Sequence, residues 1–371
     1  MKKVFKIFSI IAFIVLIALL CRFLLPVSSD SEPGFPEETV LPSEKPQPQI
    51  SEKPPEPFSP QQTPEPVDYE VNYSAIPEAI MPKLTEADKA AYKAVVRAYF
   101  NYETEAEFAA SDKIQSLKQL LELCCPVFYS DVEEDSIQIS GNRILWEYSD
   151  SQQEHNRNIE IFENVINEYR SYAEKSDNDT TKALLLYKLF CSRVIYDNPT
   201  EDYLKGEAPR PDKMCDNCID VFLSGRGICH CLARGYAFLL NQAGIEAFTA
   251  DADGGVGHHE WTVLKLDGKW YYADPTWDRG GKKLYYFGMT ADRRAADGYL
   301  LENTEYFAGG DFPLENDFSI TDTRFKMLYT GQCSGEFYEI DVKNNLILIY
   351  RLDPEGKLYL YEPGTFYLNA G

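Results

Sequence analysis

Cys229 lies where the sequence predicts the start of a helix. Gly225 and Gly227 come just before it, and apolar residues then recur at helical spacing until Gly244. At the N-terminus of a helix, unpaired backbone N–H groups and the positive end of the helix dipole lower the pKa of a thiol and favour the nucleophilic thiolate. The same N–H groups can hold an oxyanion. We therefore expect Cys229 to act as a nucleophile.

A cysteine nucleophile needs a base, and the sequence contains four histidines. His155 lies in a polar stretch. His230 follows Cys229 on the same helix, where its side chain is expected to point elsewhere. The neighbouring pair His258 and His259 therefore supplies the best candidate.

The strands around this pair indicate which of the two histidines is the base. Residues 259–266 and 269–276 read as two strands joined by Asp267-Gly268, a dipeptide typical of two-residue hairpin loops. With that loop, His259 and Asp274 become diagonal neighbours on one face, roughly 7–8 Å apart between backbones and within reach of long side chains. The other histidine of the pair then points to the opposite face.

Cys229, His259 and Asp274 are together the three parts of an acyl-transfer triad. The aspartate fixes the tautomer of the imidazole, and the imidazole keeps the thiol ionised. In such a site the thiolate attacks an amide carbonyl and the histidine gives a proton to the leaving amine. An amine or water then resolves the thioester.

The motifs around these residues resemble the transglutaminase-like superfamily, whose core is papain-like, and point to a bacterial, membrane-anchored member. The resemblance covers about 100 of the 371 residues. It rests on Gly227-x-Cys229, His259-x-Trp261, Asp267-Gly268-Lys269-Trp270-Tyr271 and Asp274-x-Thr276-Trp277, with Ile195-Tyr196-Asp197 similar to the segment that precedes the cysteine in bacterial members. The resemblance implies that Cys229 is the nucleophile, His259 the base and Asp274 its orienter. It implies acyl transfer to an amine, as in a transglutaminase, or to water, as in a protease or amidase.

The surroundings of the nucleophile depart from the family pattern at one place. Many members have glycine and tyrosine two and three positions after the cysteine, where this sequence has Cys231 and Leu232. The neighbouring pocket wall must therefore differ. The aromatic residues of the two strands form either a substrate groove or part of the core: Trp261, Trp270, Tyr271 and Trp277.

Four neighbouring cysteines allow a competing interpretation. Cys215-x-x-Cys218 precedes Cys229-x-Cys231, and four thiolates would satisfy a tetrahedral zinc ion. However, two cysteines at a helix start cannot easily face one metal, and a compartment outside the cell favours disulfides over free thiols. We expect no metal and no cofactor, and a disulfide that uses Cys215, Cys218 or Cys231 stays open.

Composition and charge exclude some classes of function. Hydrophobic residues make up 44% of the chain and charged residues 26%, which is typical of a globular protein of two or three domains. The formal net charge of −23 argues against a nucleic-acid-binding protein, because that function needs a concentrated basic surface. Nine cysteines are too few for a disulfide scaffold of this length, and their odd number leaves at least one thiol without an intramolecular partner.

The N-terminus predicts a membrane anchor over residues 1–25. Lys2, Lys3 and Lys6 flank an apolar stretch that is about long enough to cross a bilayer core of roughly 30 Å, and the positive flank should stay in the cytoplasm. A cleaved signal peptide is the alternative, although no small-x-small site closes the apolar run. A lipid-modified Cys21 is a third alternative, but Leu20 precedes it where a small residue is needed.

Residues 26–82 form a predicted linker. Twelve prolines fall between Pro26 and Asp68, and a segment of this composition cannot bury enough apolar surface to fold. Its extended reach, on the order of 130 Å, would hold a domain away from a membrane, for example within a cell wall.

Two further segments flank the catalytic core predicted at residues 178–300. Residues 83–177 predict a helical subdomain with a helix after Thr85, one over 104–124, one over 159–173, and a hairpin around Gly141-Asn142. After the core strands, a further strand is expected over 283–287 and a helix over 290–304. Residues 301–371 predict a β-rich segment, with Asp353-Pro354-Glu355-Gly356 turning between two of its strands.

The predicted fold class is α+β: a papain-like transglutaminase core in which the helix carrying Cys229 packs on an antiparallel sheet carrying His259 and Asp274. The expected partners are a protein or peptide substrate, cell-wall associated or free, and the membrane through the N-terminal helix. We expect no nucleic acid, and the catalytic domain should lie outside the cytoplasm. The alternative function is a non-catalytic module with the same fold that binds proteins or cell-wall polymers.

Overall fold

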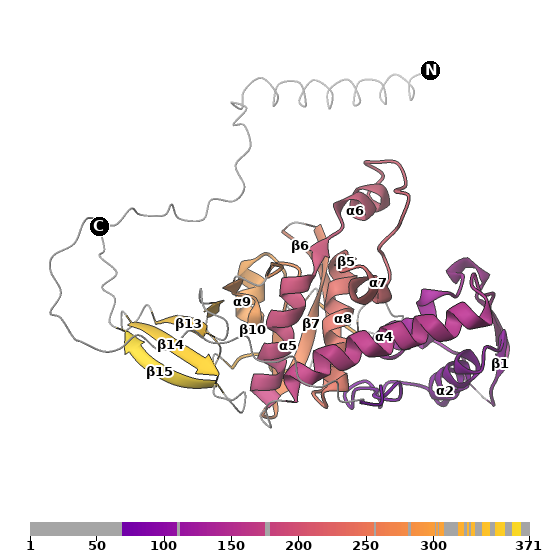
Figure 1. Cartoon of the computed structure of the whole chain (residues 1–371), viewed down its shortest axis with the longest axis horizontal. Helices are drawn as coiled ribbons and strands as arrows, with labels where there is room; N and C mark the ends of the chain where they lie inside the picture. The colour runs from indigo at the N-terminus through magenta and orange to yellow at the C-terminus, as the bar shows by residue number, and fades with distance from the viewer. Residues whose placement is uncertain are drawn as a thin grey trace, which may run out of the picture. The chain divides into compact units, whose positions relative to one another are not determined.

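The computed structural model describes residues 69–364 with several gaps, at 110–111, 175–178, 256, 281–282, 301, 303, 308–317, 323–324, 326–327, 331–335, 342–345 and 353–357 (Figure 1). The predicted anchor over 1–25 and residues 26–68 of the predicted linker lie outside the described residues. The prediction is wrong for the end of the linker, 69–82, because Val71 and Ile80 there are buried in the apolar core. Among the residues that are described, no helix combines the length and the apolar composition that a membrane span needs. The fold is mixed helix and antiparallel sheet, as predicted.

A five-stranded sheet carries the candidate site. Its strands follow the order β10-β8-β7-β6-β11, with bounds Phe287–Met289, Lys269–Ala273, Gly257–Leu266, Ala247–Gly254 and Glu305–Tyr306. The hairpin of β7 and β8 has the predicted register, because Thr262 lies opposite Ala273 and Leu266 opposite Lys269. Asp267 and Gly268 form the loop with φ of 49° and 77°, which is why the Asp-Gly dipeptide marks this turn.

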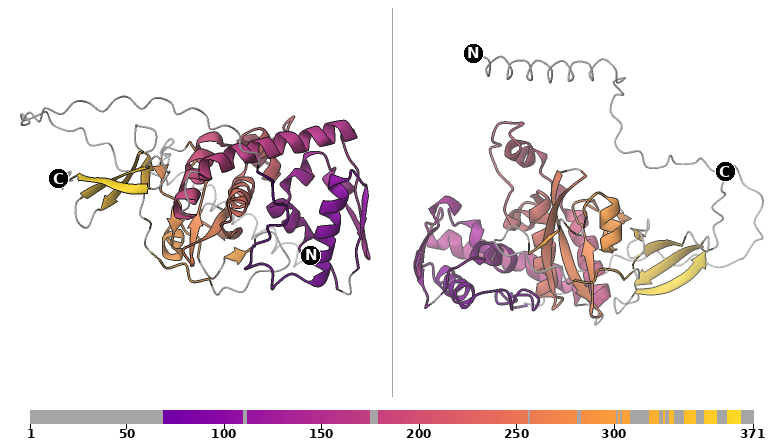
Figure 2. Two further views of the ribbon diagram at one scale, coloured as in Figure 1. Left: turned by 60° about the horizontal axis from the view of Figure 1, so that its bottom comes forward. Right: turned by 180° about the vertical axis from the view of Figure 1, so that it is seen from behind.

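Helix α8 (Cys229–Gln242) packs on β6 and β7 and contacts α5 (Asp179–Arg193) and α7 (Cys218–Leu223) (Figures 1 and 2). Its inward face is apolar, as the helical spacing predicts, and it ends before Gly244, whose φ is 78°. Alternate side chains of β7 reach different helices. Thr262 donates a hydrogen bond to the Ala233 carbonyl on α8, whereas Trp261 faces α9 (Ala291–Ala296).

Gly227 shows why the residue two before the cysteine must be small. It lies in β5 (Arg226–Gly227), which pairs in parallel with β4 (Ile195–Tyr196). A Cβ at this position would lie 2.7 Å from Val221 Cγ1 and 2.8 Å from Cys231 Cβ. Only glycine therefore lets the chain pass between α7 and α8 on its way into Cys229.

The N-terminal helices are α2 (Glu86–Phe100), α3 (Leu117–Cys124) and α4 (Gln152–Ala173), with short 3₁₀ segments at Pro126–Ser130 and Glu134–Ser136. Thr85 begins α2 with a capping box to Asp88, as predicted. The predicted helix over 104–124 is wrong in its first half. There β1 (Glu105–Glu107) pairs with β3 (Arg143–Leu145), which in turn forms the predicted hairpin with β2 (Gln138–Ser140).

The C-terminal part contains a second antiparallel sheet in the order β15-β14-β13-β12-β9. Its strands are Leu358–Gly364, Leu346–Leu352, Glu336–Asp341, Leu328–Thr330 and Lys283–Leu284. Most of the described residues of this segment form strands, while the predicted turn residues 353–356 lie outside the described residues. The expected helix over 290–304 is shorter than predicted: it is α9, which ends at Ala296 because the chain then turns at Gly298, whose φ is 93°.

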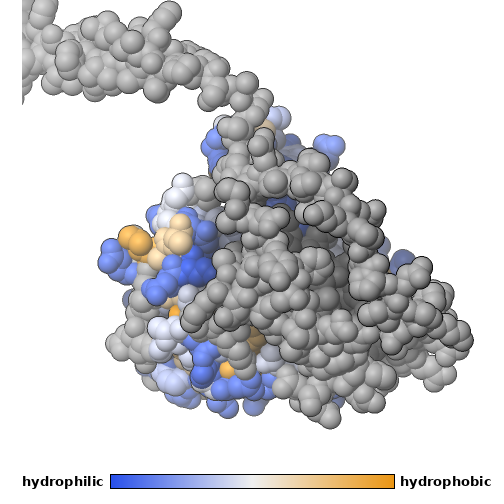
Figure 3. All heavy atoms as spheres, turned by 90° about the vertical axis from the view of Figure 1, so that its left-hand side faces the viewer, coloured by the Kyte–Doolittle hydropathy of each residue, from blue (hydrophilic) through white to orange (hydrophobic). Residues whose placement is uncertain are grey.

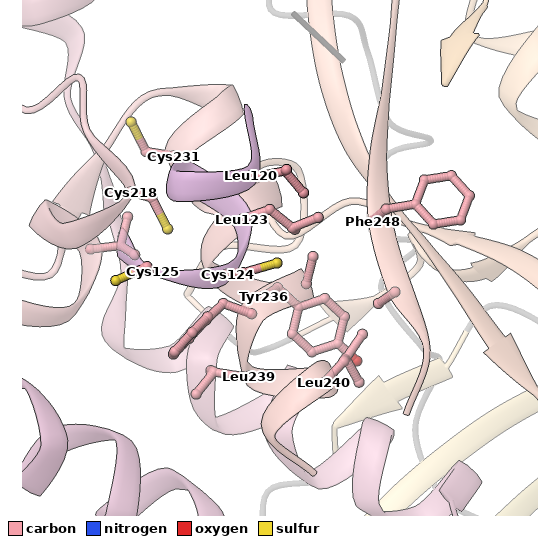
Figure 4. Packing of buried hydrophobic residues seen from close by; sticks show 14 of the residues in the cluster. Leu120, Leu123, Cys124, Cys125, Cys218, Cys231, Tyr236, Leu239, Leu240 and Phe248 are labelled. Atoms are coloured by element: carbon pink, nitrogen blue, oxygen red, sulfur yellow. The ribbon is translucent and has the colours of Figure 1, made fainter. Parts of the chain in front are cut away.

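One apolar core joins the N-terminal helices to the sheet. Figure 4 shows side chains from α3, α7, α8 and β6 packed together, among them Leu120, Leu123, Cys124, Cys125, Cys218, Cys231, Tyr236, Leu239, Leu240 and Phe248. An ion-pair bridge runs beside it, because Arg234 of α8 pairs with both Glu122 of α3 and Glu260 of β7. Through Arg234, helix α3 is therefore linked to β7, the strand that carries His259.

Polar side chains dominate the described residues seen on one face of the protein. On the face drawn in Figure 3, the coloured residues are mostly hydrophilic, with small separate hydrophobic spots. The exposed large hydrophobic side chains come from different elements: Met81, Ile139, Ile161, Ile195, Leu204, Leu223 and Leu300. Single exposed apolar residues of this kind are usual for a folded domain.

Candidate active site

Three elements bring the sequence-predicted residues into one place. Cys229 is the first residue of α8, His259 is the third residue of β7, and Asp274 directly follows β8. His259 and Asp274 are both buried, whereas Cys229 is partly exposed. A helix start and the ends of two paired strands thus position a thiol, an imidazole and a carboxylate.

His259 and Asp274 are joined by a hydrogen bond of 2.7 Å between Nε2 and Oδ2. The backbone N–H of Thr276 donates to the other carboxylate oxygen at 3.0 Å, which fixes the carboxylate plane. Burial alone would raise the pKa of Asp274, but the charges and hydrogen bonds of His259 and Arg294 outweigh it and lower this pKa to about 2. Asp274 is therefore an anion at every physiological pH.

The thiol of Cys229 lies within the influence of two imidazoles. Burial alone would raise its pKa, but hydrogen bonds and positive charge from His230 and His259 lower it to about 6. For His259, burial alone would lower the pKa, while Asp274 and Cys229 together raise it to about 9. Between about pH 6 and pH 9 the pair consequently exists as thiolate and imidazolium. Since Nε2 of His259 is bonded to Asp274, its Nδ1 is the atom left to face the sulfur.

His230 contradicts the expectation that its side chain points elsewhere. Its Nε2 lies 2.8 Å from the carbonyl oxygen of Asp216, and this anchor turns the ring toward the sulfurs of Cys229 and Cys231. Burial alone would lower the pKa of His230, but these sulfurs and Glu260 raise it well above its ordinary value. This contact could not be predicted from the sequence, because Asp216 lies 14 residues away on another segment.

Tyr196 is a second group that reasoning from the sequence left without a role. Burial, the thiol of Cys229 and the carboxylate of Glu201 on α6 (Asn198–Leu204) raise the pKa of Tyr196, whereas the backbone of Cys229 lowers it. The tyrosine therefore lies beside the start of α8. The similarity of the Ile195-Tyr196-Asp197 segment to bacterial family members was the available signal.

Aromatic rings enclose the imidazole of His259. Trp277 stacks on it with ring centroids 5.5 Å apart and 25° between the planes, and Trp261 and Tyr299 lie at 6.2 and 5.7 Å. The sequence left open whether the aromatic residues line a substrate groove or belong to the core, and the structure places them differently. Trp261 and Trp277 border the site, whereas Trp270 packs on Phe248 away from it.

Arg294 also reaches the site, and no motif pointed to it. Its guanidinium donates to Asp274 Oδ2 at 2.7 Å. The sequence signal was weak, because Arg294 is one of two adjacent arginines in a short helix.

The four cysteines of the alternative zinc site, Cys215, Cys218, Cys229 and Cys231, do not form a cluster of metal ligands. In the described part of the chain, no three His, Cys, Asp or Glu side chains are grouped as metal ligands would be. Cys215, Cys218 and Cys231 are buried free thiols. Cys231 donates to the carbonyl oxygen of Cys215 with a sulfur-to-oxygen distance of 3.6 Å, so it faces backbone rather than another thiol.

No family model matches the sequence, and no curated protein matches it. Solved structures found to be similar include a proposed cysteine protease from Cytophaga hutchinsonii, a TGase, and a proposed protease from Parabacteroides distasonis. Their identities are 16%, 14% and 13%, they cover 31%, 46% and 38% of this chain, and their TM-scores are 0.24, 0.29 and 0.24. This chain spans 37%, 50% and 35% of theirs, which is half or less of their length. At these values the likeness assigns no chemistry to this chain.

Proposed function

We propose that the protein is a transglutaminase-like thiol acyltransferase or peptidase that acts on protein or peptide amides. The observation that carries this proposal is the arrangement of Cys229 at the start of α8 within hydrogen-bond influence of His259, whose Nε2 bonds Asp274 at 2.7 Å. The nucleophile, the base and the group that orients the base are the parts that covalent acyl transfer needs.

In the proposed reaction the thiolate of Cys229 attacks the amide carbonyl and forms a carbon–sulfur bond. The oxyanion develops near the backbone N–H of Cys229 at the start of α8, beside Tyr196. The imidazolium of His259 then gives its proton to the leaving amine as the carbon–nitrogen bond breaks. The neutral imidazole next takes a proton from an incoming amine or water, which attacks the thioester and releases Cys229.

A test with an activated ester separates this function from a binding module. With p-nitrophenyl acetate, the wild-type chain should release a burst of p-nitrophenolate close to one equivalent, because acylation of a reactive thiol precedes slow hydrolysis. Mass spectrometry of the tryptic peptides should place the acetyl group on Cys229. Adding a primary amine then shows the acceptor: faster turnover with an amide product indicates a transferase, and unchanged turnover indicates hydrolysis.

The exposed His258 gives a matched control for this assay. His258→Ala changes the residue beside His259 without touching the thiol and should keep the burst. An acetyl group spread over lysines, with no burst at Cys229, would favour the non-catalytic module that binds proteins or cell-wall polymers. The proposed location of the domain outside the cytoplasm, on the anchor over residues 1–25, decides where its substrates should be sought.

A further inference from the structure

Arg294 is a fully charged side chain in the interior of the protein. Only 1% of its surface is exposed, and a guanidinium keeps its proton in proteins. Four aromatic rings surround it at 4.5 to 5.8 Å from their centroids: Trp277, Tyr299, Trp261 and Tyr286. Burying a cation is costly unless it is paired, so its partners reveal what holds it there.

Its partners are two carboxylates on opposite sides. One terminal nitrogen donates to Asp274 Oδ2 at 2.7 Å, and the other donates to Asp297 Oδ2 at 3.2 Å. Oδ2 of Asp274, which accepts the hydrogen bond from Arg294, is also the oxygen that bonds to His259 at 2.7 Å. A row of alternating charge therefore runs from Cys229 through His259, Asp274 and Arg294 to Asp297.

We propose that Arg294 is a positioning residue of the candidate active site. It holds the carboxylate of Asp274 in place and partly neutralises the negative charge that Asp274 directs at His259. This inference rests on the proposed function of Cys229. The rings of Trp261 and Trp277 support it, because they contact both Arg294 and His259 and so keep water from the shared oxygen.

The sign of the effect follows from the charge. Removing a cation raises the pKa of every nearby ionisable group, because the protonated form of each is then less disfavoured. This holds for the residues of the row and for the other groups that face them from neighbouring elements: His230, Tyr187, Cys191, Asp278, Tyr286 and Arg293. Loss of Arg294 should therefore move the ionisation of Cys229 to higher pH.

The experiment measures the alkylation rate of Cys229 by iodoacetamide against pH in the full chain, with the site of alkylation confirmed by mass spectrometry. In Arg294→Met the midpoint should rise by roughly one pH unit. Arg294→Lys keeps the charge and should return the midpoint at least halfway to the wild-type value. Arg293→Met is the matched control. It removes a positive charge from the same helix but leaves the hydrogen bonds to Asp274 intact, so the midpoint should shift less than in Arg294→Met.

A second variant keeps the inference testable if Arg294→Met does not fold. Asp297→Asn removes a negative charge at a partly exposed position and should lower the midpoint by a few tenths of a pH unit. A merely structural Arg294 would reduce the folded fraction without moving any midpoint, and such a result in both variants would overturn the inference. An ordinary thiol midpoint in the wild-type chain would instead overturn the proposed function itself.

Discussion

Replacing Cys229 by alanine is expected to abolish the acyl-enzyme burst, and replacing His259 by alanine to slow it by roughly 10³-fold or more. The sulfur is the only atom of the site that can form the thioester. Without His259, the thiolate loses one of the two imidazoles that stabilise it, and with an amide substrate the leaving amine would also lose its proton donor. Stopped-flow release of p-nitrophenolate at pH 7.5 measures both effects.

The two residues should also act as a unit. Once Cys229 is absent, His259→Ala should change the remaining rate by less than about twofold, because there is no thiol left to activate. His258→Ala, at a side chain that is 61% exposed, provides the control and should leave the rate close to wild type. If the losses in the two single variants were partial and multiplied in the double variant, the residues would not belong to one mechanism.

Asp274→Asn is expected to lower turnover by roughly 10² to 10⁴-fold while the chain stays folded. The amide can present an N–H to Nε2 of His259 and so favours the wrong tautomer, and the imidazolium loses its counter-ion. With that charge gone, the pKa of His259 should fall from about 9, and the alkaline limit of activity should move down with it. Turnover of the activated ester across pH 5 to 10 measures both the loss and the shift.

The control for this variant is Asp253→Asn. Its side chain is 89% exposed beside His258, so the substitution removes a carboxylate near the site without touching His259. Circular dichroism and the melting temperature of each variant separate a loss of activity from a loss of fold. A nearly active Asp274→Asn with an unchanged alkaline limit would mean that the carboxylate only supports the structure.

The candidate residues could be predicted because the signals that place them are local. Asp267-Gly268 fixes the hairpin loop, and the loop fixes the register that sets His259 beside Asp274. The glycine at 227 and the helical spacing that follows it place Cys229 at a helix start. Each of these steps spans fewer than 20 residues, where turn chemistry and periodicity are strongest.

The parts that sequence reasoning missed depend on contacts between distant segments. The apolar spacing after Thr104 suits a helix, but Glu105–Glu107 instead pairs with β3, which lies nearly 40 residues further along the chain. His230 faces the thiol because the carbonyl of Asp216 holds its ring, and Arg294 reaches Asp274 from a separate helix. No periodicity or turn motif records such contacts, because they exist only after the chain has packed.

The pH dependence of Cys229 alkylation in the wild-type chain tests the central claim most directly, since it needs no knowledge of the substrate. The rate should rise with a midpoint near pH 6, stay high, and change again near pH 9 as His259 loses its proton. A cysteine without such partners ionises near pH 8.5. A single midpoint there, unchanged in His259→Ala, would contradict the claim that Cys229 is an activated nucleophile.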